Sequence, residues 1–143
     1  MPKYSSGVED YLKAILHISG KGGYARTKDI AEELKVKPPS VTEMVVKMAK
    51  DKLVDYEKYG GVRLTRKGEK LAKLIKERQE VIESLFELML VPGRTAKKDS
   101  CKLEHQLSPE TLSNLKLFLK FLKSKGHYEK LKKDFKKTKE GYK

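Results

Sequence analysis

Apolar residues recur at intervals of three and four along most of the chain, and this spacing predicts a mainly α-helical protein. Two short runs in the first half are instead typical of strands joined by a hairpin. The expected elements of this half are helices over 7–19, over 27–34 and from Pro38-Pro39 onward, then strands over 53–56 and 62–64. Thr27 is a suitable N-cap for the second helix, and the turn over 57–61 contains the glycines that a hairpin needs.

The second half of the chain is predicted to be helical. Thr65 would cap a long helix that runs to about Met89, and a helix near 95–106 would follow. Ser108-Pro109-Glu110 supplies an N-cap, a proline for the first turn and an acidic residue for the next helix. Its apolar face is so wide that it indicates a subunit interface as much as a core: Leu112, Leu115, Leu117, Phe118, Leu119, Phe121 and Leu122.

A helix, a tight turn, a second helix and a hairpin, in that order, define a winged helix-turn-helix. Ala31 is small where two helices would cross, Val36 lies in the turn, and Val41 is apolar ten residues after Ala31. Lys35 stands where glycine or asparagine is commoner, because that position often takes a left-handed conformation. The predicted fold is mainly α, with a winged helix-turn-helix domain over 1–68, a helical domain over 69–125 and a basic tail over 126–143.

The second helix of such a unit enters the major groove of DNA, with its first exposed residues near base edges. Candidate base contacts are Pro39, Ser40, Thr42, Glu43 and Lys47, because polar groups can bond base edges and a proline or threonine methyl can touch thymine methyls. Candidate phosphate contacts around that helix are Arg26, Thr27, Lys28, Lys37, Lys50, Lys58 and Arg63. The alternative is a winged helix used only for contacts with another protein.

Composition and charge narrow the class of protein further. The net charge is +13 over 143 residues, which favours nucleic acid or an acidic membrane surface as a partner. No apolar run approaches the ~18 residues of a membrane-spanning helix, the first residues lack a signal sequence, and one cysteine cannot form an intrachain disulfide. We therefore expect a cytoplasmic protein that is neither secreted nor embedded in a membrane.

The last 28 residues, 116–143, carry +8 of this net charge on a weak apolar stripe. Three interpretations stay open for them. They are a dimer-packing helix with a solvated outer face, an additional contact with the DNA backbone, and an amphipathic helix at a membrane surface.

Cys101, Glu104 and His105 form the richest cluster of ligand-type residues in the sequence. Their spacing of i, i+3 and i+4 puts a thiolate, a carboxylate and an imidazole on one face of a helix, where they can converge on one metal ion. The spacing alone also fits a small buried cysteine beside an ordinary solvated pair.

Several segments resemble the diphtheria-toxin-repressor family of iron- and manganese-dependent transcriptional repressors. They occur in order from residue 7 to about 110 and are Val8-Glu9-Asp10-Tyr11-Leu12, Thr27-Lys28-Asp29-Ile30-Ala31-Glu32, Pro38-Pro39-Ser40-Val41-Thr42-Glu43-Met44, Tyr56-Glu57-Lys58-Tyr59-Gly60-Gly61-Val62-Arg63-Leu64-Thr65 and Cys101-Lys102-Leu103-Glu104-His105-Gln106-Leu107-Ser108. The resemblance implies a homodimer that represses metal-homeostasis genes by binding a palindromic operator in double-stranded DNA. The length fits the short form of the family, without the additional SH3-like domain.

The resemblance also implies which residues bind metal. Asp10 would join Cys101, Glu104 and His105, so that the ion connects the DNA-binding domain with a helical domain that serves dimerisation and metal binding. Glu83 matches one ligand of an ancillary site.

Three other positions depart from the ligand pattern of the family. Lys13 stands in place of a carboxylate, and Gln79 and Lys97 stand in place of histidines. A lysine cation repels a metal ion, so we do not expect a complete second site.

Ligand softness guides the choice of metal. A thiolate at Cys101 suits Fe(II), Co(II), Ni(II) or Zn(II) better than Mn(II), which prefers oxygen ligands. We favour Fe(II) as the cofactor. Mn(II) is the alternative, because Asp10 is the residue typical of the manganese-type members, and Zn(II), Co(II) or Ni(II) are expected to bind in vitro.

Two other functions compete with a metal-activated repressor. One is a small metalloenzyme, and the other is a winged-helix DNA-binding protein that does not respond to metal. The sequence has no carboxylate placed as an obvious general base, no glycine-rich phosphate loop and no nucleophile elbow. We therefore expect neither enzymatic activity nor a small-molecule substrate.

Overall fold

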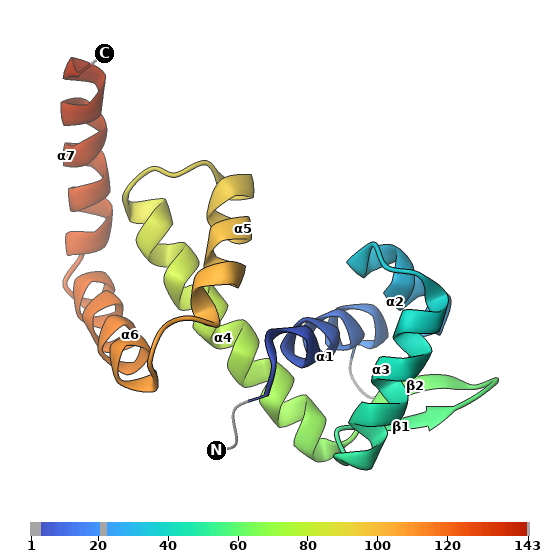
Figure 1. Ribbon diagram of the computed structural model, residues 1–143. Coiled ribbons are helices and arrows are strands. Elements are labelled where there is room, and N and C mark those ends of the chain that lie inside the picture. Colours follow the sequence, from blue (N-terminus) through green and yellow to red (C-terminus); the bar gives the residue numbers. More distant parts are fainter. Residues whose placement is uncertain (1–3, 21–22, 143) are drawn as a thin grey trace. The chain divides into compact units, whose positions relative to one another are not determined.

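The computed structural model describes residues 4–20 and 23–142, which form seven α-helices and one two-stranded antiparallel sheet (Figure 1). The chain divides into two units, Met1–Lys76 and Glu77–Lys143, and the boundary falls inside one long helix. The mainly α fold predicted from the apolar periodicity is confirmed.

The first unit is a winged helix-turn-helix. Its elements are α1 (Ser6–Ser19), α2 (Thr27–Leu34), α3 (Pro38–Lys50), β1 (Val54–Glu57), β2 (Gly61–Leu64) and the first part of α4 (Arg66–Leu88). In the hairpin Val54 pairs with Leu64 and Glu57 with Gly61. Ala25 extends this pairing, because its N–H donates to the Val62 carbonyl at 2.7 Å and its carbonyl accepts the Val62 N–H at 2.8 Å.

Local sequence signals set the starts of the helices. Ser5 Oγ accepts the Val8 N–H at 3.3 Å ahead of α1, and Ser108 Oγ accepts the Thr111 N–H at 3.1 Å ahead of α6. Thr65 Oγ1 accepts the Gly68 N–H at 3.1 Å, which confirms the predicted cap of the long helix. The prediction for Thr27 is wrong by one position, since the backbone turns helical at Thr27 and the N-cap is Arg26.

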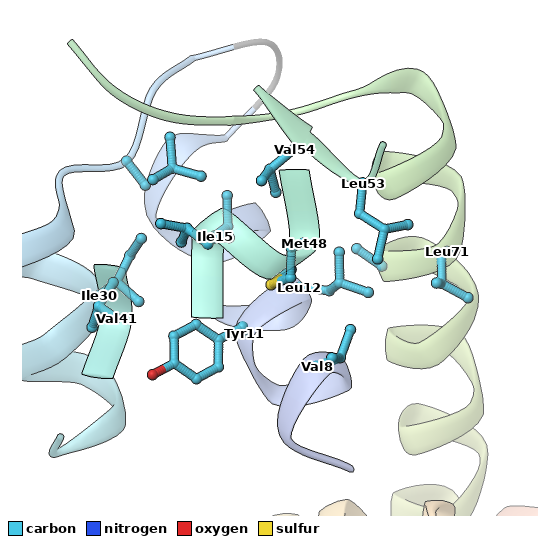
Figure 2. Close-up of a cluster of buried hydrophobic side chains, with 14 of the residues drawn as sticks. Val8, Tyr11, Leu12, Ile15, Ile30, Val41, Met48, Leu53, Val54 and Leu71 are labelled. Atoms are coloured by element: carbon cyan, nitrogen blue, oxygen red, sulfur yellow. The ribbon is translucent and has the colours of Figure 1, made fainter. Parts of the chain in front are cut away.

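A hydrophobic core joins the elements of the first unit (Figure 2). Each of the three small helices contributes side chains that are fully buried, among them Leu12, Ile15, Ile30, Val41 and Met48. The hairpin adds Val54 and Val62 to the same cluster. Burial of each such side chain contributes about 1.5–3 kcal/mol, so the packing fixes α3 and the hairpin with respect to each other.

Two glycines are required by close approaches of the backbone. A Cβ at Gly68 would lie 2.0 Å from the Leu53 carbonyl oxygen, so α4 passes directly over the start of the hairpin. Gly61 has a φ of +97°, and a Cβ there would lie 2.8 Å from the Ala25 carbonyl oxygen. Of the two adjacent glycines in the predicted turn, Gly61 is the one with positive φ.

Helices α2, α3 and α4 are each followed, within two residues, by a non-glycine residue in the left-handed conformation. These residues are Lys35, Lys52 and Leu90, with φ of 56°, 59° and 62°. At α2 the Val36 N–H donates to the Ala31 carbonyl at 3.0 Å and the Lys35 N–H to the Glu32 carbonyl at 3.3 Å, which is the Schellman motif. The left-handed conformation expected at Lys35 is confirmed, and the sequence did not predict the other two.

The second unit consists of the rest of α4 with α5 (Gly93–Glu104), α6 (Pro109–Ser124) and α7 (His127–Gly141). A small cluster of Leu119, Leu122 and Tyr128 packs with Val81, Leu88 and Leu115. The Tyr128 hydroxyl donates to the Ser84 carbonyl at 2.7 Å, which attaches α7 to α4. The chain assigned to a basic tail therefore includes a helix that is fixed to its own unit.

Candidate DNA-binding surface and metal ligands

Helix α3 buries one face and exposes the other. Val41, Val45 and Met48 point into the core of the first unit. The five residues predicted to contact bases are all exposed: Pro39, Ser40, Thr42, Glu43 and Lys47. The exposed side of α3 therefore presents two hydroxyls, a carboxylate and an ammonium group, which are groups that can bond base edges in a major groove.

Val46 lies on the exposed side of α3 and was not among the predicted contacts. Its side chain is 42% exposed, although valine is apolar. Helical periodicity places it three residues after Glu43, on the same side, so the signal was present in the sequence. An exposed valine on a polar helix face is suited to contact a thymine methyl group.

The candidate phosphate contacts are distributed over α2, the ends of α3 and the hairpin. Arg26 and Lys37 are the N-cap residues of α2 and α3, and neither cap is made by a side-chain hydrogen bond within the described structure. Six of the candidates are exposed and Thr27 is half-buried; the exposed ones are Arg26, Lys28, Lys37, Lys50, Lys58 and Arg63. The N–H groups and positive dipole at the start of α2 add to this basic environment and favour an anion such as phosphate.

Three ligand-type residues lie together at the C-terminal end of α5. Cys101 and His105 are half-buried and Glu104 is buried. One ligand atom of Cys101 and one of His105 lie within 4.8 Å of each other, and His105 Nδ1 is 3.2 Å from Glu104 Oε2. Metal–ligand bonds of about 2.0–2.3 Å put two ligands of one ion about 3–4 Å apart, so small side-chain rotations suffice for shared coordination. The donor set fits a divalent transition metal.

Arg78 on α4 approaches this cluster and was not predicted to do so. Its Nη1 is 3.7 Å from Glu104 Oε1, and its side chain is largely shielded from solvent. The guanidinium offsets the negative charge of a carboxylate that is buried. A single charged residue on a long helix carries no sequence signal for such a contact, because its partner comes from a helix more than 20 positions away.

Asp10 belongs to α1 in the first unit, whereas Cys101, Glu104 and His105 belong to the second. Asp10 Oδ1 is 3.6 Å from Lys13 Nζ, one helical turn later. Lys13 therefore pairs with the carboxylate where the family pattern would provide a second carboxylate.

Glu83, the candidate ancillary ligand, lies among neutral hydrogen-bond donors. Its Oε1 is 3.5 Å from Gln79 Nε2 and 3.4 Å from Ser100 Oγ. Gln79 Nε2 also donates to the Lys97 carbonyl at 3.4 Å. The positions where the family has histidines thus take part in a hydrogen-bond network around Glu83.

Comparison with known proteins agrees with this combination of a winged helix and a helical unit with metal ligands. Residues 3–62 match the sequence model of the N-terminal DNA-binding domain of iron-dependent repressors, and residues 65–131 match that of their metal-binding and dimerisation domain. The chain belongs to this iron-dependent repressor family, also known as the diphtheria-toxin-repressor family.

Individual relatives show how far the similarity extends. The chain is 41% identical over 108 residues to the transcriptional regulator MntR of Lysinibacillus sphaericus, which covers 76% of this chain and 78% of that protein. It is 39% identical over 123 residues to an uncharacterized HTH-type regulator of Methanocaldococcus jannaschii, covering 85% of this chain and 98% of that protein. A manganese-dependent transcriptional repressor solved with manganese superposes with a TM-score of 0.71 at 27% identity, over 80% of this chain and 53% of that one. The present chain thus spans about half of that solved chain.

The protein is a metal-dependent transcriptional repressor, and its family is not enzymatic. Its partners are DNA and a second copy of the chain. Within the described residues, none of the helices combines the length and the apolar character that crossing a membrane requires.

Proposed function

We propose that this repressor responds to Fe(II) and controls metal-homeostasis genes. The observation that carries the proposal is the cysteine in the α5 cluster, where Cys101 lies beside His105. A thiolate favours Fe(II), Co(II), Ni(II) or Zn(II) over Mn(II), and metal availability in the cell then selects among them. The cytoplasm, where a lone thiol stays reduced, is the proposed location.

Asp10 is proposed to complete the site with Cys101, Glu104 and His105. Bound to one ion, these residues would connect α1 of the DNA-binding unit with α5 of the second unit. That connection would limit the relative motion of the two recognition helices in a dimer. Half-sites of a palindromic operator lie about 34 Å or a multiple apart, so an error in helix spacing lowers the affinity. Glu83 is proposed as a secondary ligand only.

Two groups of residues in the DNA-binding unit would have different roles. The exposed residues of α3 would contact bases, and the basic residues at α2 and on the hairpin would contact phosphates. The exposure of all five predicted base contacts on one helix supports this division. The unit would occupy residues 1–68, ahead of a dimerisation and metal-binding domain at 69–125.

The outer face of α6 is the proposed contact with the second copy. Leu117, Phe118 and Phe121 are 62%, 53% and 51% exposed, whereas Leu112, Leu119 and Leu122 on the same helix are buried. A helix that buries one apolar side in its own unit and exposes another has a surface suited to a partner chain. The wide apolar face noted in the sequence thus corresponds to two distinct surfaces.

Mn(II) is the second candidate activator, and a specific observation favours it. The Lysinibacillus relative is named MntR, and the solved structure cited above is a manganese-dependent repressor in complex with manganese. In this alternative the oxygen ligands of Asp10 and Glu104 would dominate the selectivity, and Cys101 would contribute less.

Anaerobic DNA binding by the chelator-stripped protein tests the proposal. Duplexes selected from a random pool serve as operators, and Fe(II), Mn(II) and Zn(II) are titrated separately at fixed salt concentration. We expect binding only with metal, and at a lower free concentration of Fe(II) than of Mn(II). Equal or better activation by Mn(II) would establish the alternative, and binding without any metal would reject both.

Variants of the α5 cluster connect this response to the site. Cys101→Ala and His105→Ala are expected to abolish metal-dependent DNA binding and to leave a folded dimer. His127→Ala is the matched control, because His127 is an exposed histidine of the same unit. An unchanged metal response in both α5 variants would remove the proposed site.

A further inference from the structure

The base of the wing carries a stacked pair that the predicted DNA contacts do not explain. The Cζ atom of Arg63 on β2 lies 5.4 Å from the centre of the Tyr24 ring. Arg63 is exposed, and Tyr24 keeps 47% of its surface exposed although it lies next to the buried Ala25. A large aromatic residue left in solvent, with an arginine over its face, is typical of a surface that contacts a charged partner.

The backbone fixes both members of this pair. Ala25 and Val62 exchange two hydrogen bonds, of 2.7 and 2.8 Å, so the residues next to them, Tyr24 and Arg63, are held at neighbouring positions. A Cβ at Gly61 would lie 3.5 Å from the Tyr24 Cβ and 2.8 Å from the Ala25 carbonyl oxygen, so this approach requires a glycine. The position of the ring is therefore fixed at the base of the hairpin and does not depend on its tip.

Within the described residues, Arg63 takes part in no ion pair. The nearest acid in the strand register is Asp55, which is paired with Arg63 across the hairpin but makes no salt bridge with it. A guanidinium that stacks on a ring keeps its five N–H donors free, because they point outward in the plane of the group. Two of these donors can bind two oxygens of one phosphate at the same time. Phosphate in duplex DNA is the anion that this edge fits, since the exposed Arg26 and Lys28 lie close by in sequence at the start of α2.

We infer that Tyr24 is a positioning residue for DNA binding, which orients the Arg63 guanidinium toward a backbone phosphate at the base of the wing. This inference rests on the proposed phosphate contact of Arg63 and adds the residue that makes the contact directional. An arginine without a stacking partner loses much of its side-chain conformational freedom when it binds a phosphate, whereas a stacked arginine is already partly ordered and loses less.

A double-mutant cycle on operator DNA, with metal-loaded protein, tests this role. Tyr24→Leu keeps the bulk of the side chain and removes the aromatic face. In the wild-type background it is expected to weaken binding about two- to twelvefold per half-site, because an arginine that is no longer held loses about 0.5–1.5 kcal/mol of side-chain freedom when it binds. In the Arg63→Ala background the same change is expected to have no effect, because there is no guanidinium left to orient. Tyr24→Phe keeps the ring and is expected to bind like the wild type.

The salt dependence separates positioning from charge. Arg63→Ala should lower the slope of log Kd against log salt by about two, which is about one for each half-site. Tyr24→Leu should weaken binding and leave this slope unchanged, because it removes no charge. The inference would be overturned if Tyr24→Leu lowered the DNA affinity equally with and without Arg63. It would also be overturned if Tyr24→Phe lowered the affinity, because that loss would indicate a direct contact between the hydroxyl and DNA. Thermal unfolding of each variant confirms an intact fold. Absence of operator binding by the wild type would instead reject the proposed function.

Discussion

At the scale of single residues, DNA affinity and DNA specificity are expected to reside in different side chains of α3. Glu43 is exposed near the start of the helix and Lys50 is exposed at its last residue. A carboxylate near base edges can accept a hydrogen bond from a cytosine amino group, so it discriminates among bases. An ammonium group near the backbone attracts phosphate whatever the sequence.

Glu43→Ala is therefore expected to relax base preference at one position of each half-site, with a loss of discrimination of about 1–3 kcal/mol. Lys50→Ala should weaken all sequences alike and lower the salt slope by about two, which is about one for each half-site. Binding of each variant to a randomised duplex pool, followed by Kd measurements at several salt concentrations, distinguishes the two effects. The same change in base preference for both variants would contradict this assignment.

At the scale of secondary-structure elements, the turn between α2 and α3 is strained at one residue. Lys35 has a φ of 56° and its side chain is exposed, so the residue type makes no packing contribution that would justify the conformation. Glycine adopts this conformation without a steric cost.

Lys35→Gly is expected to raise the free energy of unfolding by about 1 kcal/mol, since the relief of left-handed strain exceeds the added entropy of the unfolded chain. Urea unfolding of the apo protein measures the change. Lys37→Gly is the control, because Lys37 is an exposed lysine with φ of −78° and has no strain to relieve. Equal effects of the two substitutions would show that the conformation of Lys35 is not the cause.

The attachment of α7 to α4 is expected to depend on pH through Tyr128. Burial and the neighbouring negative charge of Glu87 raise the pKa of Tyr128 to about 12. In the unfolded chain the phenol of Tyr128 has its ordinary pKa of about 10. Below that pH the phenol is neutral in both states, and its full contribution to the stability of the folded state is present. The contribution is lost as the pH rises from about 10 to about 12.

Tyr128→Phe should remove the late component of tyrosinate absorbance near pH 12 and lower the free energy of unfolding by about 1 kcal/mol, the contribution of a hydrogen bond such as the one to Ser84. Lys132 Nζ donates a hydrogen bond to Glu87 Oε1 at 3.1 Å and lowers the pKa of Glu87. The ionised Glu87 therefore stabilises the fold at neutral pH, and this contribution is lost when the carboxylate is protonated at low pH. An unchanged alkaline titration in Tyr128→Phe would show that the late component comes from another tyrosine.

At the scale of the whole molecule, the function depends on two copies of the chain. DNA recognition by a palindromic operator requires two recognition helices at a fixed spacing. The exposed residues Leu117, Phe118 and Phe121 make α6 the proposed site of contact between the copies.

Phe118→Asp is expected to weaken the dimer by roughly 100-fold or more, because it would bury an unpaired carboxylate in an apolar contact. Sedimentation velocity over a range of protein concentrations gives the dissociation constant. Tyr59→Asp is the control, since Tyr59 is an aromatic residue that is 94% exposed on the wing, far along the chain from α6. A dimer of unchanged strength in Phe118→Asp would place the interface on another surface.

The elements and their order follow from local patterns in the amino-acid sequence. Apolar spacing located the helices, and capping residues such as Thr65 and Ser108 set where two of them begin. The i, i+3, i+4 spacing put Cys101, Glu104 and His105 on one side of the C-terminal end of α5, where His105 is the C-cap. These features follow from the chain within a few residues, so local physical chemistry is sufficient to predict them.

Contacts between residues that are distant in the sequence become visible only in the folded structure. Arg78 lies beside Glu104 and Tyr24 beneath Arg63, and both pairs join residues that are more than 20 positions apart. The same holds for the α6 face, whose apolar residues look alike in the sequence and divide into buried and exposed sets only when α6 packs on its unit. Such contacts depend on how helices cross and how strands pair, and no local pattern of residues carries that information.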